Sequence, residues 1–222
     1  NKTISGLWCN TDEDYTALIA LAESISIKDL TIEIAEGKNI KGGNYTAVII
    51  GKASDCVMDN CHVVGSVIGK DYLGGFAGFV ASGTISNCTS EVSIQGANYI
   101  GGIAGVVTAT ITKCRAVCSI SGSSDVLCNA GGIVGYSTAN IKECYARGSI
   151  NTTSESCYIG GIAGYNCATI ENSYSSVQLS STQYAAGIAG YNTGKVDKCY
   201  ASGDLSAVLY GAGIVGYNDG ES

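Results

Sequence analysis

The sequence predicts an all-β fold, a right-handed parallel β-helix of about seven coils, each with 26–30 residues and about three strands. Three observations predict this fold. A glycine-rich unit recurs at a near-constant spacing, a second unit with isoleucine and cysteine follows it, and tyrosines keep the same repeat positions. A residue type that holds its position over many such repeats is typical of a solenoid, whose repeats bury their apolar side chains only by stacking.

The first unit is a short apolar segment between two glycines. Its copies lie 26 to 30 residues apart and begin at Gly75, Gly102, Gly132, Gly161, Gly187 and Gly213. The register extends towards the N-terminus without both glycines, at residues 47–51 and 17–20. Residues 4–7 resemble the tail of a still earlier coil, so we expect a stack that is open at both ends.

The second unit follows about nine residues later and predicts a half-buried strand. It has an apolar residue followed three positions on by cysteine or serine, and then alternates between apolar and polar residues. In one copy, Cys114, Ala116, Cys118 and Ile120 share one side of the segment. Such alternation is typical of a β-strand with one buried face. No stretch has a useful 3.6-residue apolar period, so we expect no helices.

Stacked coils of this kind form a parallel β-helix. Each strand pairs with the same strand of the next coil, about 4.8 Å away, and the cysteine and isoleucine side chains gather in one axial core. Parallel crossovers are almost always right-handed. A β-sandwich is the alternative, but it gives no reason for one residue type to recur in every coil. We therefore expect one repeat domain over residues 1–222, a piece of a longer protein with flanking domains.

The composition excludes several classes of function. The chain has 12 lysines and arginines against 19 aspartates and glutamates, with no basic patch that would suit a nucleic acid. No apolar run approaches the roughly 20 residues of a transmembrane helix, so we expect no transmembrane segment in this chain. There is a single histidine, His62, and no Cys-x-x-Cys pair. We therefore expect neither a metal site nor a cofactor.

All 14 tyrosines fall into three repeat positions. The first column lies three residues before the glycine unit and is interrupted by Asn129. The second column follows the glycine unit, and the third follows the cysteine position. Identical rings at the coil spacing gain offset stacking contacts, so we expect three aromatic ladders.

The third column is the candidate binding site. Tyr145, Tyr174 and Tyr200 alternate with inward residues, which places them on the solvent side of their strands. Tyr165 and Tyr191 of the second column are expected nearby, so that the five rings form a flat aromatic strip. Such a strip stacks on sugar rings or binds protein partners. The alternative is a ladder that only stabilises the coil.

The 11 cysteines are the most unusual feature of the composition. Most are expected to be small buried residues, because the main cysteine column also contains leucine and serine. Disulfide stapling is the alternative. Cys128 and Cys157 are the best candidates, since they align in adjacent coils and the expected Cα spacing of about 4.8 Å lies within the disulfide range.

Two groups of polar residues are candidate sites. Asp12, Glu13 and Asp14 suggest calcium, but the alternating ligand spacing is absent and a solvated turn is expected. A mixed column before the cysteine position is expected to face solvent, and is unlike the paired acid and base of a glycosidase. Its members are Asp59, Asn87, Lys113, Glu143, Asn172 and Lys198.

Several of these units resemble a known family. Residues 131–136, 160–166 and 186–194 are similar to the GLUG motif. That motif recurs in large secreted or surface-anchored bacterial proteins, including adhesin-like proteins and the non-catalytic regions of immunoglobulin-A-cleaving metallopeptidases. Residues 1–7 resemble the segment that usually precedes such repeats. The resemblance implies a β-helical structure, surface display and no catalytic residue on the repeats.

Taken together, these observations favour a non-enzymatic adhesive or spacer module at the surface of a bacterium or outside it. The expected partners are a host protein or a glycan. A carbohydrate-active β-helix, such as a polysaccharide lyase or hydrolase, is the alternative, and it would need acidic and basic residues clustered in a groove. An ice-binding face is a weaker alternative, because no column is consistently threonine.

Overall fold

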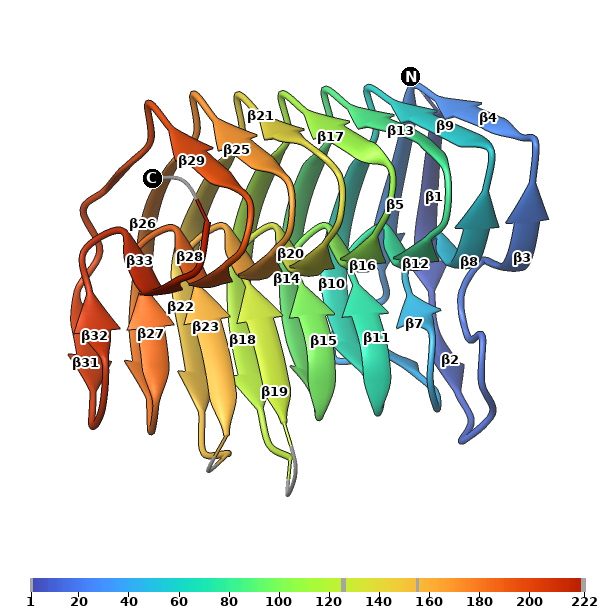
Figure 1. The fold of residues 1–222 in the computed structure, drawn as a ribbon. Helices are drawn as coiled ribbons and strands as arrows, with labels where there is room; N and C mark the ends of the chain where they lie inside the picture. The colour runs from blue at the N-terminus through green and yellow to red at the C-terminus, as the bar shows by residue number, and fades with distance from the viewer. Residues whose placement is uncertain (1, 125–126, 155, 221–222) are drawn as a thin grey trace.

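Almost every strand of this chain pairs with the equivalent strand one coil later. The structure, a computed structural model, describes residues 2–124, 127–154 and 156–220. Asn1, the start of the segment that resembles the family's leading residues, lies outside them. The strands are parallel and build four sheets, so the expected parallel β-helix is confirmed (Figure 1).

The sheets are named here I to IV, in the order in which each coil visits them. Sheet I contains β1 (Lys2–Leu7), β5 (Leu30–Ile34), β10 (His62–Ile68), β14 (Thr89–Gly96), β18 (Arg115–Gly122), β22 (Tyr145–Thr152), β26 (Tyr174–Ser181) and β30 (Tyr200–Ala201), with β2 (Cys9–Asn10), β6 (Ile40–Lys41) and β31 (Leu205–Ala207) attached. Sheet II contains β7 (Thr46–Ala47), β11 (Asp71–Gly74), β15 (Asn98–Gly101), β19 (Cys128–Gly131), β23 (Cys157–Gly160), β27 (Tyr184–Ala186) and β32 (Gly211–Ala212).

The other two sheets complete each coil. Sheet III contains β3 (Ile19–Glu23), β8 (Ile50–Ser54), β12 (Ala77–Val80), β16 (Ala104–Val107), β20 (Val134–Ser137), β24 (Ala163–Asn166), β28 (Ala189–Asn192) and β33 (Val215–Asn218). Sheet IV contains β4 (Ser26–Lys28), β9 (Cys56–Asp59), β13 (Gly83–Ser86), β17 (Thr110–Thr112), β21 (Ile141–Lys142), β25 (Thr169–Glu171) and β29 (Lys195–Asp197).

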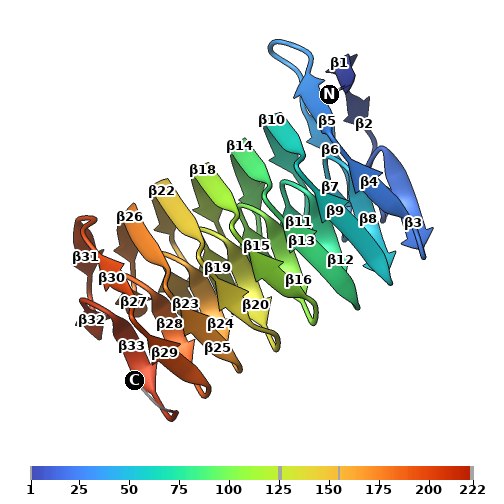
Figure 2. The ribbon, with the colours of Figure 1, turned by 90° about the horizontal axis from the view of Figure 1, so that it is seen from above.

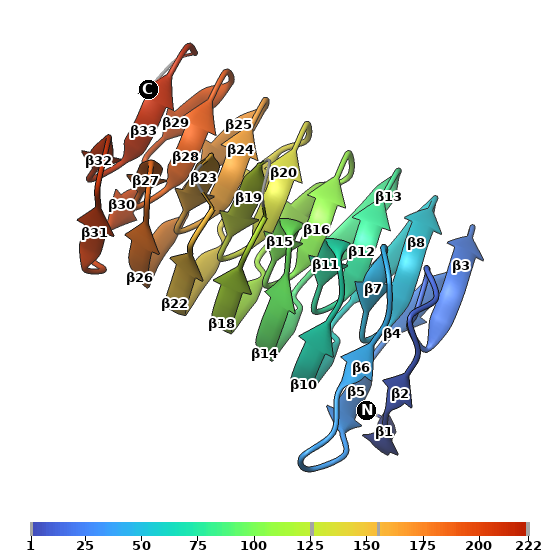
Figure 3. The same cartoon turned by 90° about the horizontal axis from the view of Figure 1, so that it is seen from below.

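The eight strands of sheet III mark about eight turns, close to the seven expected. In Figure 1 the chain advances from the blue to the red end as it rises through sheet II on the near side and descends through sheet I on the far side, which is a right-handed path. Figures 2 and 3 show the sheets running continuously along the stack. At about 4.8 Å a turn, about eight turns advance about 40 Å.

Each complete coil has four strands, and the expectation of three was wrong. The reason lies in the glycine unit, which bends in its middle: β15 ends at Gly101, Gly102 and Ile103 turn the corner, and β16 begins at Ala104. The bend is tight against the neighbouring coil, because a Cβ on Gly102 would lie 2.3 Å from the carbonyl oxygen of Gly132. Glycine at this position therefore lets successive corners stack.

A second corner joins sheet IV to sheet I, just before the cysteine column. The residue before each cysteine, or before the serine in its place, has a left-handed backbone with φ near +50°. These corner residues are Asn60, Asn87, Lys113, Glu143, Asn172 and Lys198. The sequence grouped Asp59 with these residues, which was wrong by one position, because the corner residue of that coil is Asn60 and Asp59 lies in β9. Asp59 accepts hydrogen bonds from Ser86 and Asn87, both at 2.7 Å.

The axial core follows the alternation of the sequence. In β18, Ala116, Cys118 and Ile120 are buried, and the residues between them face solvent or lie half-buried. Phe76 and the equivalent corner residues Ile103, Ile133, Ile162 and Ile188 are also fully buried, whereas Ile214 in the last coil is exposed. The apolar face of each coil thus packs against the next coil along one continuous interior.

Candidate functional site

A ladder of three tyrosines runs along the outer face of sheet I. Tyr145, Tyr174 and Tyr200 are the first residues of β22, β26 and β30, and they pair in register. The ring centroids lie 4.1 Å apart for the first pair and 4.9 Å for the second, with the planes 22° and 4° apart. Tyr200 is 58% exposed, while the other two rings are half-buried. The three side chains therefore lie on the solvent side.

This stacking changes what the ladder offers to a ligand. The faces of the central ring are covered by its two neighbours, and the Arg115 guanidinium lies 5.8 Å from the centroid of the Tyr145 ring. Burial, together with the neighbouring tyrosines, raises the pKa of the Tyr174 hydroxyl, which keeps it protonated. A ligand can therefore reach ring edges and phenol hydroxyls along the ladder, and a free ring face mainly at Tyr200.

Polar side chains continue this surface across sheet I. Figure 3 shows β14, β18, β22 and β26 side by side, and the last two outward positions of these strands form in-register rows of serine, asparagine and glutamine. A shallow groove of about 450 Å³ lies over the C-terminal part of these rows. It is lined by Ser149, Asn151, Gln178, Leu179, Ser180, Asp204, Leu205 and Ser206. The surface can donate and accept many hydrogen bonds with little charge.

Tyr165 and Tyr191 do not lie beside the ladder of sheet I, where they were expected. They lie in β24 and β28 of sheet III, and in each coil a strand of sheet II or sheet IV separates sheet III from sheet I. Their rings stack on each other at 4.6 Å, and both meet the edge of Tyr158 from sheet II. Within the described residues, no ring contact joins them to the ladder of sheet I.

The first and second tyrosine columns pack together as a double ladder. Tyr45 stacks on Tyr72 at 4.4 Å, and both rings meet Phe79 edge to face. Asn129 interrupts the first column, and there its amide nitrogen and side chain bond to the Asn98 side chain at 2.9 and 3.0 Å. These contacts tie sheet II to sheet III and indicate a stabilising role.

Cys128 and Cys157 pair in register in β19 and β23, as expected, but both are free thiols. In-register parallel side chains stay about 4.8 Å apart at Cβ, beyond the roughly 3.5–4.5 Å that a disulfide needs. Cys157 Sγ lies 2.6 Å from the Ser181 hydroxyl. Burial raises the pKa of the Cys128 thiol to about 12. This geometry favours two buried thiols over a disulfide.

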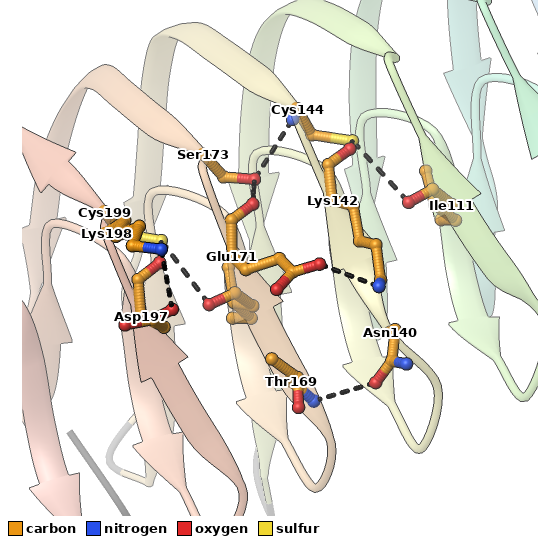
Figure 4. Close-up of polar contacts among 11 residues, drawn as sticks. Ile111, Asn140, Lys142, Cys144, Thr169, Glu171, Ser173, Asp197, Lys198 and Cys199 are labelled. Atoms are coloured by element: carbon orange, nitrogen blue, oxygen red, sulfur yellow. Dashed lines mark hydrogen bonds and ion pairs between the residues drawn. The ribbon is translucent and has the colours of Figure 1, made fainter.

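The main cysteine column is hydrogen-bonded and, apart from the half-buried Cys199, it is buried, as expected for structural thiols. Cys144 Sγ donates to the carbonyl oxygen of Lys142 at 3.2 Å and lies 3.9 Å from that of Ile111 one coil earlier (Figure 4). The same pair of contacts recurs at the other column members, Cys61, Cys88, Cys114 and Cys199. The thiols therefore fasten each left-handed corner to the coil before it.

The charged candidates are engaged in local contacts. Asp14 accepts from the backbone and side-chain nitrogens of Asn44 at 2.7 and 3.4 Å, and Asp12 pairs with Lys41 at 3.1 Å, as in a solvated turn. Lys142 pairs with Glu171 at 2.7 Å (Figure 4), and this contact lowers the pKa of that carboxyl. Among the described residues, no cluster of three or more metal-ligating side chains occurs.

One buried polar element was missed at the sequence level. Asn166, Asn192 and Asn218 form an asparagine ladder in sheet III, with amide-to-oxygen distances of 2.7 and 2.8 Å between successive side chains. Each amide also donates to the carbonyl oxygen two residues on. The signal was the tripeptide Gly-Tyr-Asn, which recurs at residues 164–166, 190–192 and 216–218.

Comparison with protein families identifies two of the coils. Residues 71–95 and 127–151 match the GLUG motif. Two coils of the chain are GLUG repeats. Each matched GLUG repeat is one coil, from β11 to β14 and from β19 to β22, so the motif begins in sheet II and ends in sheet I.

Two further comparisons, with curated proteins and with solved structures, found no relative of this chain. Within the described residues, no helix has the length and apolar character to cross a membrane.

Proposed function

We propose that this chain is a non-enzymatic GLUG-repeat module of a secreted or surface-displayed bacterial protein, in which it acts as an adhesive spacer. The match to the GLUG motif supports that setting, because the motif recurs in proteins of this kind. The observation that carries the adhesive role is the outer face of sheet I, where Tyr145, Tyr174 and Tyr200 stand beside in-register polar rows. Its ligand is a glycan or a protein of the host.

The proposal assigns the spacer role to the stack itself. Parallel pairing in four sheets joins each coil to the next, and the core runs along the whole stack. Because the repeats of a solenoid stack along one axis, the stack keeps the segments at its two ends apart. In a longer protein, the module would separate the parts on either side of it while presenting the face of sheet I.

A glycan array tests the adhesive role. We expect the chain to bind, and the triple variant Tyr145→Phe, Tyr174→Phe, Tyr200→Phe to bind at least about tenfold more weakly, because it keeps the ring stack and removes three hydroxyls that hydrogen-bond a sugar. The matched control is Tyr15→Phe, Tyr45→Phe, Tyr72→Phe, which removes three hydroxyls from the first tyrosine column.

Two results would contradict the proposal. Equal binding by the sheet I variant and the control would remove the adhesive role from this ladder. Release of products from any member of a polysaccharide panel would show a carbohydrate-active enzyme instead of a non-enzymatic module.

A further inference from the structure

The two arginines of this acidic chain lie together on the outer face of sheet I. Arg115 is the first residue of β18, and Arg147 is the third of β22. Arg115 pairs in register with Tyr145, and Val117 pairs with Arg147. The two arginine positions are therefore diagonal neighbours, about 8 Å apart at Cα given the spacing of strands and residues. All other cationic residues of the chain are lysines, apart from His62.

Both guanidinium groups are available to a ligand. Both side chains are exposed, and within the described residues neither arginine forms an ion pair. Several lysines, in contrast, are already paired with carboxylates, such as Lys142 with Glu171. The nearest acid by register is Glu91 in β14, a diagonal neighbour of Arg115 that lies 3.5 Å from His62.

The rest of the face has no acid close to the arginines. The outward residues of β22 and β26 are tyrosine, arginine, serine, asparagine and glutamine. The nearest outward acid towards the C-terminus is Asp204, two coils beyond Arg147. In a chain with a formal net charge of −7, this is a local cationic surface.

We infer that this face binds an acidic polysaccharide whose sugar rings carry carboxylates, an inference that rests on the proposed adhesive function. A guanidinium group binds a carboxylate through two parallel hydrogen bonds, which suits Arg115 and Arg147. The phenol hydroxyls and the serine, asparagine and glutamine rows supply partners for sugar hydroxyls. The groove on this face is shallow and lined mainly by polar residues, which favours a polysaccharide over a protein partner that would need a buried apolar anchor.

Oligogalacturonate and its methyl ester test this inference, because they share the sugar ring and differ in the carboxylate charge. We expect the unmodified chain to bind the acid at least about tenfold more tightly in isothermal titration calorimetry. The variant Arg115→Gln, Arg147→Gln should lose this preference, and Arg115→Lys, Arg147→Lys should retain part of it. The matched control Lys28→Gln, Lys195→Gln removes two exposed charges from sheet IV and should keep the full preference.

The outcomes separate this inference from the proposed function. Equal affinity for the acid and the ester, or a preference that survives Arg115→Gln, Arg147→Gln, overturns the acidic ligand and leaves the adhesive role in place. Absence of binding to every glycan tested overturns the acidic polysaccharide and restricts the adhesive role to a protein ligand. Circular dichroism of each variant checks that the β-helix is intact, so that a lost preference reports on the ligand contact.

Discussion

Ser173 and Cys144 connect two neighbouring coils through one hydroxyl. The backbone amide of Cys144 donates to Ser173 Oγ at 3.0 Å, and Ser173 Oγ donates to the carbonyl oxygen of Glu171 at 2.9 Å (Figure 4). Ser173 stands where the other complete coils around it carry a cysteine, and it is equally buried. The Ser173 hydroxyl thus bonds the carbonyl oxygen two residues before it, as the column thiols do, and it also accepts a hydrogen bond from the buried Cys144 amide.

Replacing Ser173 should show what this corner contact contributes. Ser173→Ala leaves the Cys144 amide and the second lone pair of the Glu171 carbonyl without a partner, so we expect it to lower the free energy of unfolding by about 1–3 kcal/mol. Ser173→Cys restores the residue of the neighbouring coils and should cost less. Urea unfolding followed by circular dichroism measures both. A cysteine variant less stable than the alanine variant would contradict the role assigned to the column.

At the stacked glycine corners, the effect of a Gly→Ala substitution on stability should depend strongly on the coil in which it is made. A Cβ on Gly132 would lie 2.2 Å from the carbonyl oxygen of Gly161, whereas a Cβ on Gly213, at the same repeat position in the last coil, has no atom within 4 Å. We expect Gly132→Ala to destabilise the protein by at least about 1–3 kcal/mol through overpacking, and Gly213→Ala to leave its stability nearly unchanged. Thermal unfolding of the two variants compares them directly, and equal shifts in Tm would contradict the stacking argument.

The periodic residues made the architecture predictable. In-register pairing such as Thr89 with Arg115 follows from one repeat length, and the solvent-side placement of Tyr174 follows from alternation along β26. The number of strands was not predictable in the same way. Gly102 and Ile103 sit inside a continuous run of small and apolar residues, where alternation does not reveal a bend.

The sequence also did not predict which columns of side chains lie next to one another in space. Tyr165 and Tyr174 are close in the chain, but the corner at Asn172 and the strand β25 turn them to different sides of the coil. The asparagine ladder went unnoticed because Asn166 and Asn192 look like ordinary turn residues after a tyrosine. Side-chain amides reveal a buried ladder only when the coil places them in line.

The asparagine ladder should be a large source of stability. Asn192 is fully buried: its side-chain oxygen accepts from the Asn166 amide at 2.7 Å, and its amide donates to the side-chain oxygen of Asn218 at 2.8 Å. Asn192→Ala leaves buried polar groups of two coils unpaired, so we expect a loss of at least about 2 kcal/mol in the free energy of unfolding.

The end of the same ladder provides the control for Asn192. Asn218 is exposed to solvent, which can replace lost hydrogen bonds, so Asn218→Ala should cost clearly less. Asn192→Ser should also cost less than Asn192→Ala, because Ser137 holds the equivalent position and bonds the Ala139 carbonyl at 2.7 Å. Similar losses for Asn192→Ala and Asn218→Ala would mean that the ladder stabilises the coil only weakly.

Alkaline pH should unfold this protein more readily than neutral pH. Burial raises the pKa of the Cys118 and Cys128 thiols to about 12, and burial with neighbouring tyrosines raises the pKa of Tyr158. These groups keep their protons longer in the folded than in the unfolded chain. Their contribution is complete below the unfolded pKa values of about 8.5 for cysteine and 10 for tyrosine, and is lost as pH rises towards the folded ones.

The pH dependence can be assigned to one thiol. We expect the free energy of unfolding to be level from pH 7 to about 8 and then to fall with rising pH. Cys118→Ala removes one titrating group and should reduce this slope by up to about 1.4 kcal/mol per pH unit. Cys9→Ala, which removes a half-buried thiol at the N-terminal end, is the matched control. Urea unfolding at pH 7 to 11 measures the slopes, and a slope that Cys118→Ala does not reduce would show that this thiol is not responsible.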